Sequence, residues 1–423
     1  MQQTEADVRE EQNRPALSNP PSPIPHPPSP IPHPPSPMRL VVVGGGHASL
    51  PLLQNARTLV GAGHEVTLVS DRPELWYSGM TPEWLGGVYG QPDVTVPLGP
   101  ICQAAGVRFV QGRAVALDRG ARAVRLADGA EVGYDVVALD VGAVNPGRDR
   151  ADGAVRAKPL WRIERLGELL EAGAGEPRRL VVVGGGAAGT ECALNVTARY
   201  GGRLAVTVVE PGDRLCPALP ARLGHSAART LRQRGAEVRF GARAESAGPD
   251  GVRLETGETL AADAVLWATG SVGQPLFREA GLTVTDDGFA VVDRGLRSVD
   301  DGRVFVAGDS ATVRGHEGLR KVGVHAVKHG PVLRENVAQA LAALGRGQDP
   351  AAVPLRPFRP YPVTPLVVTT GEPDAWLAVG PFALRGRPWL RLKHVVDRRW
   401  IDRYRDGAGY RRLWDARSAS AVG

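Results

Sequence analysis

The sequence has 423 residues, which is enough for about two to three domains. Its 43% hydrophobic and 23% charged residues are typical of a globular protein, and it contains no continuous apolar run of the roughly 20 residues that a membrane-spanning helix needs. The formal net charge is +6, but only four of the 51 basic residues are lysines. This arginine-dominated excess is weak support for nucleic-acid binding, so we expect no nucleic-acid partner.

The three cysteines, Cys102, Cys192 and Cys216, lie far apart and have neither CxxC nor metal-ligand spacing. The N-terminus lacks the charged, then apolar, then small-residue order of a secretory signal. We therefore expect a cytoplasmic protein without a metal site.

Residues 20–37 repeat the unit PPSPIPH two and a half times. Proline fixes φ and removes a hydrogen-bond donor, so this stretch favours a solvated polyproline II conformation. We expect residues 1–37 to form a disordered Pro-rich tail, with a spacer favoured over a docking segment. Met38, directly before the first apolar run, is an alternative start.

A glycine-rich turn follows the first predicted strand, residues 39–43. The turn leads into a predicted helix over 50–60 and a second strand over 65–70, an order that presents backbone amides to a pyrophosphate. Ser49 replaces the third glycine of the pattern, and Ser70 or Asp71 stands where an acid would bind a ribose.

The same arrangement recurs about 140 residues later. A strand over 179–183 ends in a turn that contains Gly184, Gly186 and Gly189, and Glu210 follows Gly189 by 21 residues at the end of another strand. An acid at this offset binds a ribose 2′-hydroxyl and favours NADH over NADPH, although nearby Arg214 leaves the choice open. Two dinucleotides in one chain indicate a bound redox cofactor and an exchangeable substrate.

Further motifs give the chain a specific resemblance. Residues 268–270 (ATG), 304–309 (VFVAGD) and 139–142 (LDVG) each follow an apolar run. With the two turns, they resemble the two-dinucleotide-binding flavoproteins of the pyridine nucleotide-disulfide oxidoreductase superfamily. The resemblance implies an α/β fold with two Rossmann-like domains: an FAD domain over 38–155 and 271–350, an NAD(P)H domain over 156–270 inserted in it, and a small C-terminal cap over 351–423.

Residues 77–82 (YSGMTP) and 321–331 (KVGVHAVKHGP) narrow the resemblance. They are similar to type II NADH:quinone oxidoreductases and to the flavoprotein module fused to selenide, water dikinase. The resemblance implies an enzyme, an NAD(P)H dehydrogenase with noncovalent FAD and a quinone-like acceptor. Alternatives are a sulfide- or selenide-related enzyme, a ferredoxin-reductase-like enzyme, or a non-turnover partner or sensor in selenium metabolism.

Cysteine placement separates these branches. Disulfide reductases of the superfamily carry CxxxxC after the first turn, where this chain reads LPLLQNARTLV, so that chemistry is excluded. Sulfide oxidation ranks below direct NAD(P)H oxidation because no cysteine follows Cys216. Cys192 is expected to be a small buried residue.

The resemblance also implies which residues bind the two cofactors. One of these residues, Asp309, could instead cap the N-terminus of a helix that follows it. The residues expected to bind the two cofactors are Gly44, Gly45, Gly46, His47, Ser49, Ser70, Asp71, Pro82, Gly142, Gly184, Gly186, Gly189, Glu210, Gly270, Gly308, Asp309 and His325.

Two residues are candidates for catalytic roles. The resemblance places Glu191 near the nicotinamide and flavin, where it would pass protons to the acceptor; its alternative role is to stabilise a helix N-terminus. Lys321 would stabilise negative charge on reduced flavin, although an ordinary surface lysine remains the simpler reading.

The C-terminal segment predicts an amphipathic helix over 389–404, with Arg391, Arg398 and Arg405 on its basic face. Such a helix suits an anionic lipid surface, and would then place the protein peripherally on the inner face of the cell membrane. Packing on the FAD domain or on a second subunit is the alternative, and whether the chain forms a homodimer stays open. The predicted apolar face consists of Trp389, Leu392, Val395, Val396, Trp400 and Tyr404.

Overall fold

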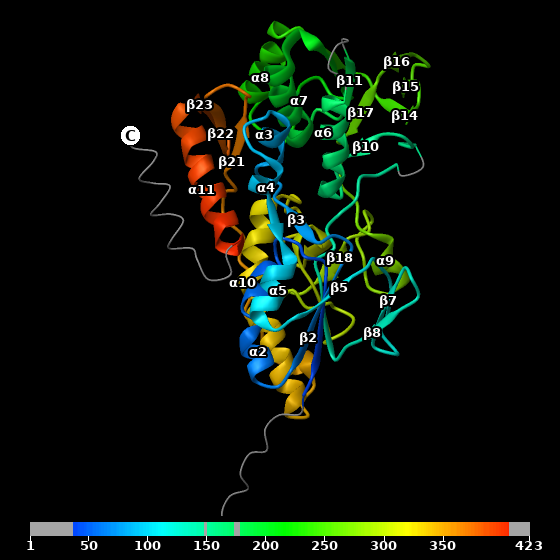
Figure 1. Ribbon diagram of the computed structural model, residues 1–423, viewed down its shortest axis with the longest axis vertical. Coiled ribbons are helices and arrows are strands. Elements are labelled where there is room, and N and C mark those ends of the chain that lie inside the picture. The colour runs from blue at the N-terminus through cyan, green and yellow to red at the C-terminus, as the bar shows by residue number, and fades with distance from the viewer. Residues whose placement is uncertain (1–36, 148–149, 173–177, 406–423) are drawn as a thin grey trace, which may run out of the picture. The chain divides into compact units, whose positions relative to one another are not determined.

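The computed structural model describes residues 37–147, 150–172 and 178–405 (Figure 1). The predicted tail therefore lies outside the described residues except for Pro37. No helix within these ranges combines the length and the apolar character needed to cross a bilayer.

The first sheet has five parallel strands in the order β19-β9-β1-β2-β5. The valine-rich run of β1 is buried on both faces, as the central strand of a parallel sheet requires. Because Val43 pairs with Leu139 and Leu139 with Val306, the loops after β1, β9 and β19 meet at one edge of the sheet. The strands are β1 (Arg39–Val43), β2 (Glu65–Ser70), β5 (Arg108–Gln111), β9 (Val136–Leu139) and β19 (Val304–Val306).

The second sheet repeats this plan with the strand order β10-β17-β11-β12-β13, again parallel. In each half, an antiparallel three-stranded meander precedes the strand that returns beside the first one (Figure 1). The second sheet consists of β10 (Val155–Arg156), β11 (Arg178–Val183), β12 (Leu204–Glu210), β13 (Glu237–Phe240) and β17 (Ala264–Trp267), and the meanders of β6 (Ala114–Asp118), β7 (Ala123–Leu126), β8 (Glu131–Gly133), β14 (Ala244–Gly248), β15 (Gly251–Leu254) and β16 (Thr259–Ala261).

The helices after the two glycine-rich turns differ. The second, α7 (Ala187–Tyr200), is continuous. The first was predicted over 50–60 but is divided into α1 (Leu50–Gln54) and α2 (Arg57–Gly61). The break falls at Asn55, whose side-chain amide donates to the carbonyl of Pro51 at 2.8 Å and so competes with the helical pattern.

The remaining elements connect or cover the sheets. A C-terminal unit of three antiparallel strands, β21 to β23, packs against the last helix, α11 (Figure 1). These elements are β3 (Glu74–Trp76), α3 (Thr81–Leu85), α4 (Gln91–Val94), β4 (Thr95–Pro97), α5 (Leu98–Ala105), η1 (Leu160–Arg162), α6 (Ile163–Glu171), η2 (Gly201–Arg203), α8 (Ala221–Gln233), α9 (Pro275–Glu279), β18 (Ala290–Val292), η3 (Gly308–Ser310), β20 (Ala311–Val313), α10 (Gly323–Gly345), η4 (Pro350–Ala352), β21 (Leu366–Thr369), β22 (Ala375–Val379), β23 (Phe382–Gly386) and α11 (Arg387–Arg405).

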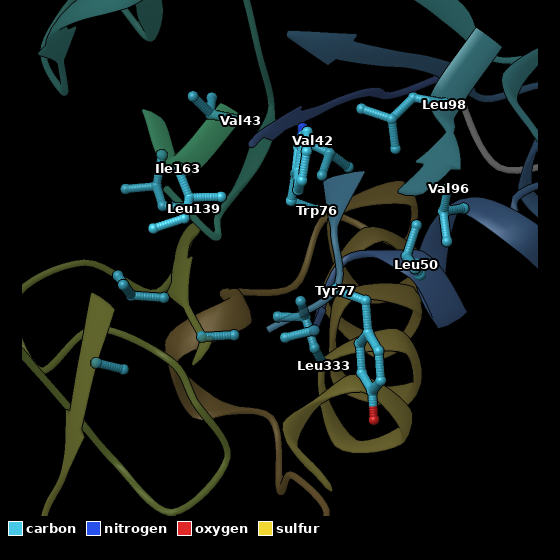
Figure 2. Packing of buried hydrophobic residues seen from close by; sticks show 14 of the residues in the cluster. Val42, Val43, Leu50, Trp76, Tyr77, Val96, Leu98, Leu139, Ile163 and Leu333 are labelled. Carbon is cyan, nitrogen blue, oxygen red and sulfur yellow. The ribbon is translucent and has the colours of Figure 1, made fainter. Parts of the chain in front are cut away.

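The core around the first sheet fixes the turn after β1. Val42, Leu50 and Leu333 are fully buried there and come from β1, α1 and α10 (Figure 2). Burying a side chain of this size contributes roughly 1.5–3 kcal/mol, so the strand and the helices that flank the turn are held firmly. The turn itself lies at the carboxyl edge of the sheet, where open α/β sheets bind their ligands.

Helix α11 confirms the predicted C-terminal helix, but the predicted apolar face is wrong. Trp400 and Tyr404 are buried, whereas Leu392, Val395 and Val396 are exposed. The buried face instead includes two charged residues. Lys393 and Asp397 point inward because each has buried polar partners there. The buried face of α11 is therefore not purely apolar.

Candidate functional site

The second glycine-rich turn forms an open cradle. A Cβ atom at Gly184 would lie 2.7 Å from the carbonyl oxygen of Ala268, and one at Gly189 would lie 2.1 Å from that of Gly184, so both positions require glycine. A Cβ at Gly186 would meet nothing within 4 Å. The backbone therefore packs closely on its inner side and leaves open space on the outer side, which fits a nucleotide pyrophosphate.

Glu210 lies beside this cradle at the end of β12. Its two carboxylate oxygens accept hydrogen bonds from the amides of Gly185 at 2.7 Å and Gly212 at 2.9 Å. Gly270 lies nearby in the loop after β17, and its carbonyl accepts a hydrogen bond from the side chain of Asn145 at 2.9 Å. The acid predicted to bind a ribose is thus in contact with the predicted pyrophosphate turn.

The first glycine-rich turn has a carboxylate in its cradle. A Cβ at Gly44 would lie 2.3 Å from the carbonyl oxygen of Asp140, and one at Gly46 would lie 2.4 Å from the Asp140 carboxylate. That carboxylate accepts hydrogen bonds from the amides of Ala48 at 2.8 Å and Ser49 at 2.9 Å. Burial raises the pKa of Asp140 to about 6, against the effect of the two amides.

The other cofactor-binding residues predicted near the first turn lie in the turn itself, at the end of β2, in loops or in α3. Gly45 faces the side chain of Leu98, and Gly142 has a φ of +68° in the loop after β9. The hydroxyl of Ser70 donates to the carbonyl of Arg72 at 2.9 Å. Asp71 is exposed next to Ser70, and Pro82 is buried in the first turn of α3.

Gly308 and Asp309 lie in η3, directly after β19. The residues after Asp309 form strand β20 rather than a helix, so the helix N-cap reading of Asp309 is wrong. Its carboxylate instead pairs with the Lys158 ammonium at 2.5 Å. The amide of Gly308 donates to His329 of α10 at 3.0 Å, and burial lowers the pKa of His329 to about 3, so that this imidazole is a neutral acceptor.

Lys321 lies two residues before α10. Its ammonium donates to the carbonyl of Ala311 and to the Thr312 hydroxyl, the latter at 3.0 Å, and lies 4.3 Å from the centre of the Phe289 ring. Burial lowers the pKa of Lys321 to about 8. Lys321 is therefore a half-buried cation near Asp309 and not a free surface lysine. His325 lies in the first turn of α10, and its Nε2 atom is 3.2 Å from the Thr364 hydroxyl.

Three aromatic rings stack beside the first turn. The Trp400 ring lies 4.3 Å from that of Tyr77 and 5.1 Å from that of His47, centre to centre and nearly parallel. Burial lowers the pKa of His47 to about 4, so His47 is neutral near pH 7. Helix α11 thus contributes a large aromatic side chain to the edge at which the cofactor-binding residues were predicted.

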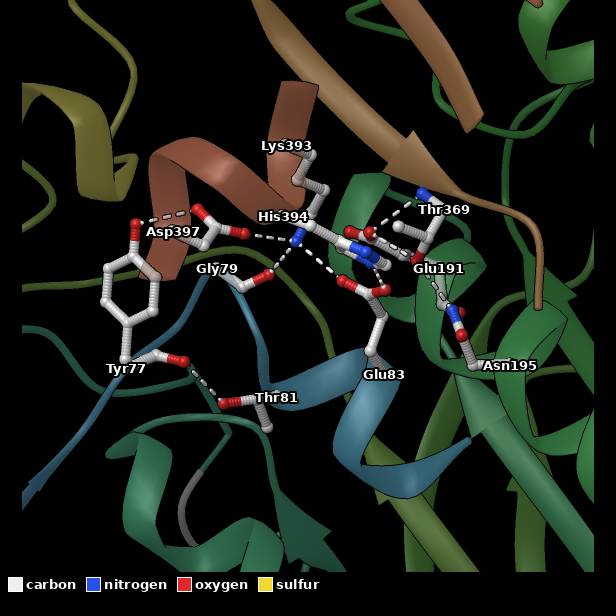
Figure 3. Close-up of polar contacts among 10 residues, drawn as sticks. All are labelled: Tyr77, Gly79, Thr81, Glu83, Glu191, Asn195, Thr369, Lys393, His394 and Asp397. Carbon is white, nitrogen blue, oxygen red and sulfur yellow. Dashed lines mark hydrogen bonds and ion pairs between the residues drawn. The ribbon is translucent and has the colours of Figure 1, made fainter. Parts of the chain in front are cut away.

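A buried ionic network, which we call the Lys393 cluster, joins α11 to α3 (Figure 3). It consists of Lys393, Glu83, Asp397 and His394. The Lys393 ammonium donates to Glu83 at 2.8 Å, to Asp397 at 2.6 Å and to the carbonyl of Gly79 at 2.5 Å, while His394 lies 2.6 Å from the second oxygen of Glu83. The Lys393 side chain is 7% exposed and that of Glu83 is 2% exposed.

The charges in this cluster hold one another ionised. Burial alone would lower the pKa of Lys393, but Asp397 and Glu83 outweigh it and raise that pKa well above its ordinary value. Burial would likewise raise the pKa of Glu83, but His394 and Lys393 hold it below its ordinary value. The Tyr77 hydroxyl donates to Asp397 at 2.9 Å, which links the cluster to the aromatic stack.

Glu191 lies next to the Lys393 cluster, on α7, the helix that follows the second glycine-rich turn (Figure 3). One of its carboxylate oxygens accepts hydrogen bonds from the amide and the hydroxyl of Thr369, both at 2.8 Å. Burial raises the pKa of Glu191 to about 7, and the charge of Lys393 partly opposes this rise. Glu191 can therefore gain or lose a proton near neutral pH.

The sequence reasoning identified the turns and Glu191 but missed most of their partners. Lys158, Lys393 and Asp397 had no local motif to mark them, and Asp140 stood unremarked within the LDVG motif. Lysines are rare among the 51 basic residues, and this signal could have found Lys158 and Lys393. Cys192 is buried, as predicted, and the three cysteines are unpaired.

Comparison with known proteins agrees with this geometry. The pattern that defines the pyridine nucleotide-disulphide oxidoreductase family matches residues 38–343. An NADH dehydrogenase-like protein of Mycobacterium tuberculosis is 30% identical over 307 residues, covering 65% of this chain and 73% of its own length. A demethylphylloquinone reductase of Synechocystis is 24% identical over 296 residues, covering 66% and 73%.

Among solved structures, the sulfide:quinone oxidoreductase of Aquifex aeolicus superposes with a TM-score of 0.65 at 18% identity. The match covers 88% of this chain and 92% of that one. At this level of identity the similarity establishes the fold: a mixed α/β architecture with Rossmann-like parallel sheets.

Proposed function

Because the chain belongs to the pyridine nucleotide-disulphide oxidoreductase family, we propose that it is a flavoenzyme that oxidises NAD(P)H and reduces a quinone-like acceptor. FAD would lie along the first turn and NAD(P)H along the second. The observation that carries this proposal is the repetition of one close-packed turn, Gly44 and Gly184, at the carboxyl edge of two separate parallel sheets.

Bound FAD would supply the redox chemistry, accepting a hydride from the nicotinamide and passing electrons to the acceptor. The chain's own residues would hold and orient the two dinucleotides. Asp309, fixed by Lys158, would accept a hydrogen bond from the sugar-alcohol chain of FAD. Lys321, whose ammonium lies near Asp309, would place positive charge at this end of the site, where negative charge develops on reduction.

Glu210 provides a test of the second cradle. Its replacement by alanine removes the acceptor for the ribose hydroxyls, so we expect the KM for NADH to rise about tenfold while FAD stays bound, since one or two hydrogen bonds are each worth about 1 kcal/mol. Steady-state kinetics at saturating acceptor measure this. The control is Asp250→Ala, in the exposed loop between β14 and β15. An unchanged KM for NADH would remove Glu210 from the cofactor site.

The acceptor would approach from the side where Trp400, Tyr77 and His47 stack. Reduction of a quinone consumes protons, and Glu191, with its pKa near neutrality, is suited to hold one. The name of the Synechocystis relative, a demethylphylloquinone reductase, supports a quinone as the acceptor class.

We further propose that the protein meets a quinone at the cytoplasmic membrane surface. Leu392, Val395 and Val396 are exposed on α11, and Phe382 is 70% exposed on the neighbouring strand β23. Helix α11 also exposes several arginines. A helix that exposes both apolar side chains and cations suits an anionic lipid surface. A second copy of the chain on the same surface is the competing occupant, and sizing in solution separates the two.

The acceptor is tested by anaerobic reoxidation. Protein reduced with NADH is mixed with a water-soluble quinone, with ubiquinone in anionic vesicles, or with a ferredoxin, and the return of flavin absorbance is followed. We expect fast return with the quinones, and faster return with vesicles that carry negative charge than with neutral ones. Return with the ferredoxin alone would replace the quinone proposal by a ferredoxin-reductase-like activity.

A further inference from the structure

The two glycine-rich turns of this chain can be compared position by position. In each turn the backbone of the first glycine, Gly44 or Gly184, packs on the carbonyl of the residue that follows the neighbouring strand, β9 or β17. That residue is Ala268 in the second half and Asp140 in the first. The third glycine position is Gly189 in the second half and Ser49 in the first. The first turn therefore differs from the second turn at two residues, Asp140 and Ser49, and these two residues are in contact with each other.

Asp140 occupies the place that the second turn leaves empty. Its carboxylate is surrounded by backbone, because a Cβ at Gly46 would lie 2.4 Å from it and one at Gly308 would lie 2.2 Å from it. It accepts the amide hydrogens of Ala48 and Ser49, which belong to the segment expected to face a pyrophosphate. In the second turn, the corresponding position near Gly186 is open.

The charges around Asp140 do not neutralise it. On η3, Asp309 adds negative charge and is itself paired with Lys158. On the turn, His47 is neutral near pH 7, and on α10, His329 is a neutral acceptor for Gly308. His325 of α10 also has a lowered pKa. Lys321, before α10, interacts with Asp309 and is bound to Ala311 and Thr312.

We propose that Asp140 sets how tightly this chain holds FAD: its carboxylate competes with the cofactor pyrophosphate for the turn amides, so FAD binding draws a proton onto Asp140 and strengthens as the pH falls. The inference rests on the proposed function, since it places FAD at the first turn. A pyrophosphate and a carboxylate in one buried cradle repel each other, and protonation of Asp140 removes that repulsion.

The direction of the pH dependence follows from proton linkage. Without FAD, Asp140 titrates at about 6. A bound pyrophosphate raises this pKa further, so the complex binds more protons than the free protein at neutral pH. The affinity for FAD is then constant below about pH 6 and falls by up to about tenfold per pH unit above it.

The experiment is a titration of the full chain, freed of flavin, with FAD. Flavin fluorescence reports the Kd between about pH 5 and about pH 7.5, a range chosen to keep Lys321 mostly protonated. We compare the wild type with Asp140→Asn, which keeps an oxygen for the two amides but carries no charge. The matched control is Asp286→Asn, an exposed acid outside the site. We expect Asp140→Asn to bind FAD at least about tenfold more tightly at pH 7.5 and with a nearly flat profile, while the control follows the wild type.

Calorimetry gives a second readout that needs no variant. In two buffers of different ionisation enthalpy, FAD binding to the wild type at neutral pH should take up close to one proton. A wild-type Kd that is flat across this range without proton uptake, or an Asp140→Asn profile that parallels the wild type, overturns the role of Asp140 and leaves the flavoenzyme proposal standing. Failure of both proteins to bind FAD at any pH overturns the two proposals together.

Discussion

Glutamine in place of Glu191 is expected to slow the acceptor half of the reaction about 100-fold, the lower end of what a positioned proton donor contributes. Glutamine still offers an oxygen to the amide and hydroxyl of Thr369, so the position of the side chain is kept. What is lost is the proton. Anaerobic stopped-flow reoxidation of NADH-reduced protein by a quinone measures this rate directly.

The pH profile separates proton donation from a structural role. Because the pKa of Glu191 is about 7, the wild-type reoxidation rate should be level below that pH and fall above it as the proton is lost. The variant should be slow and level throughout, and its reduction by NADH should stay within about twofold of wild type. The exposed carboxylate variant Glu131→Gln is the control. Equal slowing of both half-reactions with an unchanged profile would assign Glu191 a purely structural role.

Replacement of Lys393 by methionine is expected to lower the free energy of unfolding by about 3–5 kcal/mol. Methionine fills a similar volume but leaves Glu83 and Asp397 as buried carboxylates without their shared cation. The contact of α11 with the segment before α3 should also weaken, because the Gly79 carbonyl loses its donor. Urea unfolding, followed by tryptophan fluorescence, gives the change in stability.

Arg391→Met is the matched control, because Arg391 is an exposed cation on the same helix. Its effect should stay below about 0.5 kcal/mol. Acid provides an independent check: the pKa of Glu83 lies below its ordinary value of 4.5, so the stabilisation is complete above that pH and is lost as the pH falls through the lower folded-state value. A loss below about 1 kcal/mol for Lys393→Met would mean that the network behaves like an exposed ion pair.

Features encoded in neighbouring residues could be predicted from the sequence. The strands before both turns and the acid at Glu210 follow from short apolar runs and a fixed spacing, and each lies where the sequence indicates. The division of the first helix at Asn55 was missed because a single side-chain hydrogen bond decides it.

Features that depend on distant residues could not be predicted. Lys393 and Glu83 are 310 positions apart, and only the folded chain shows that a lysine on an apparently apolar helix face has buried acidic partners. The same is true of Asp140, whose significance lies in the amides it accepts from the turn 91 and 92 residues earlier. Patterns of hydrophobicity place helices and strands, but they do not reveal which buried charges will meet.

We propose that the two turns hold two dinucleotides close enough for hydride transfer between them. The most direct measurement is the absorbance spectrum of the purified chain, reconstituted with FAD and then titrated anaerobically with NADH. We expect one bound FAD per chain and complete bleaching of its absorbance by about one equivalent of NADH, since a two-electron hydride is transferred. A chain that stays colourless after incubation with FAD, or that binds FAD but is bleached by neither NADH nor NADPH, would contradict it.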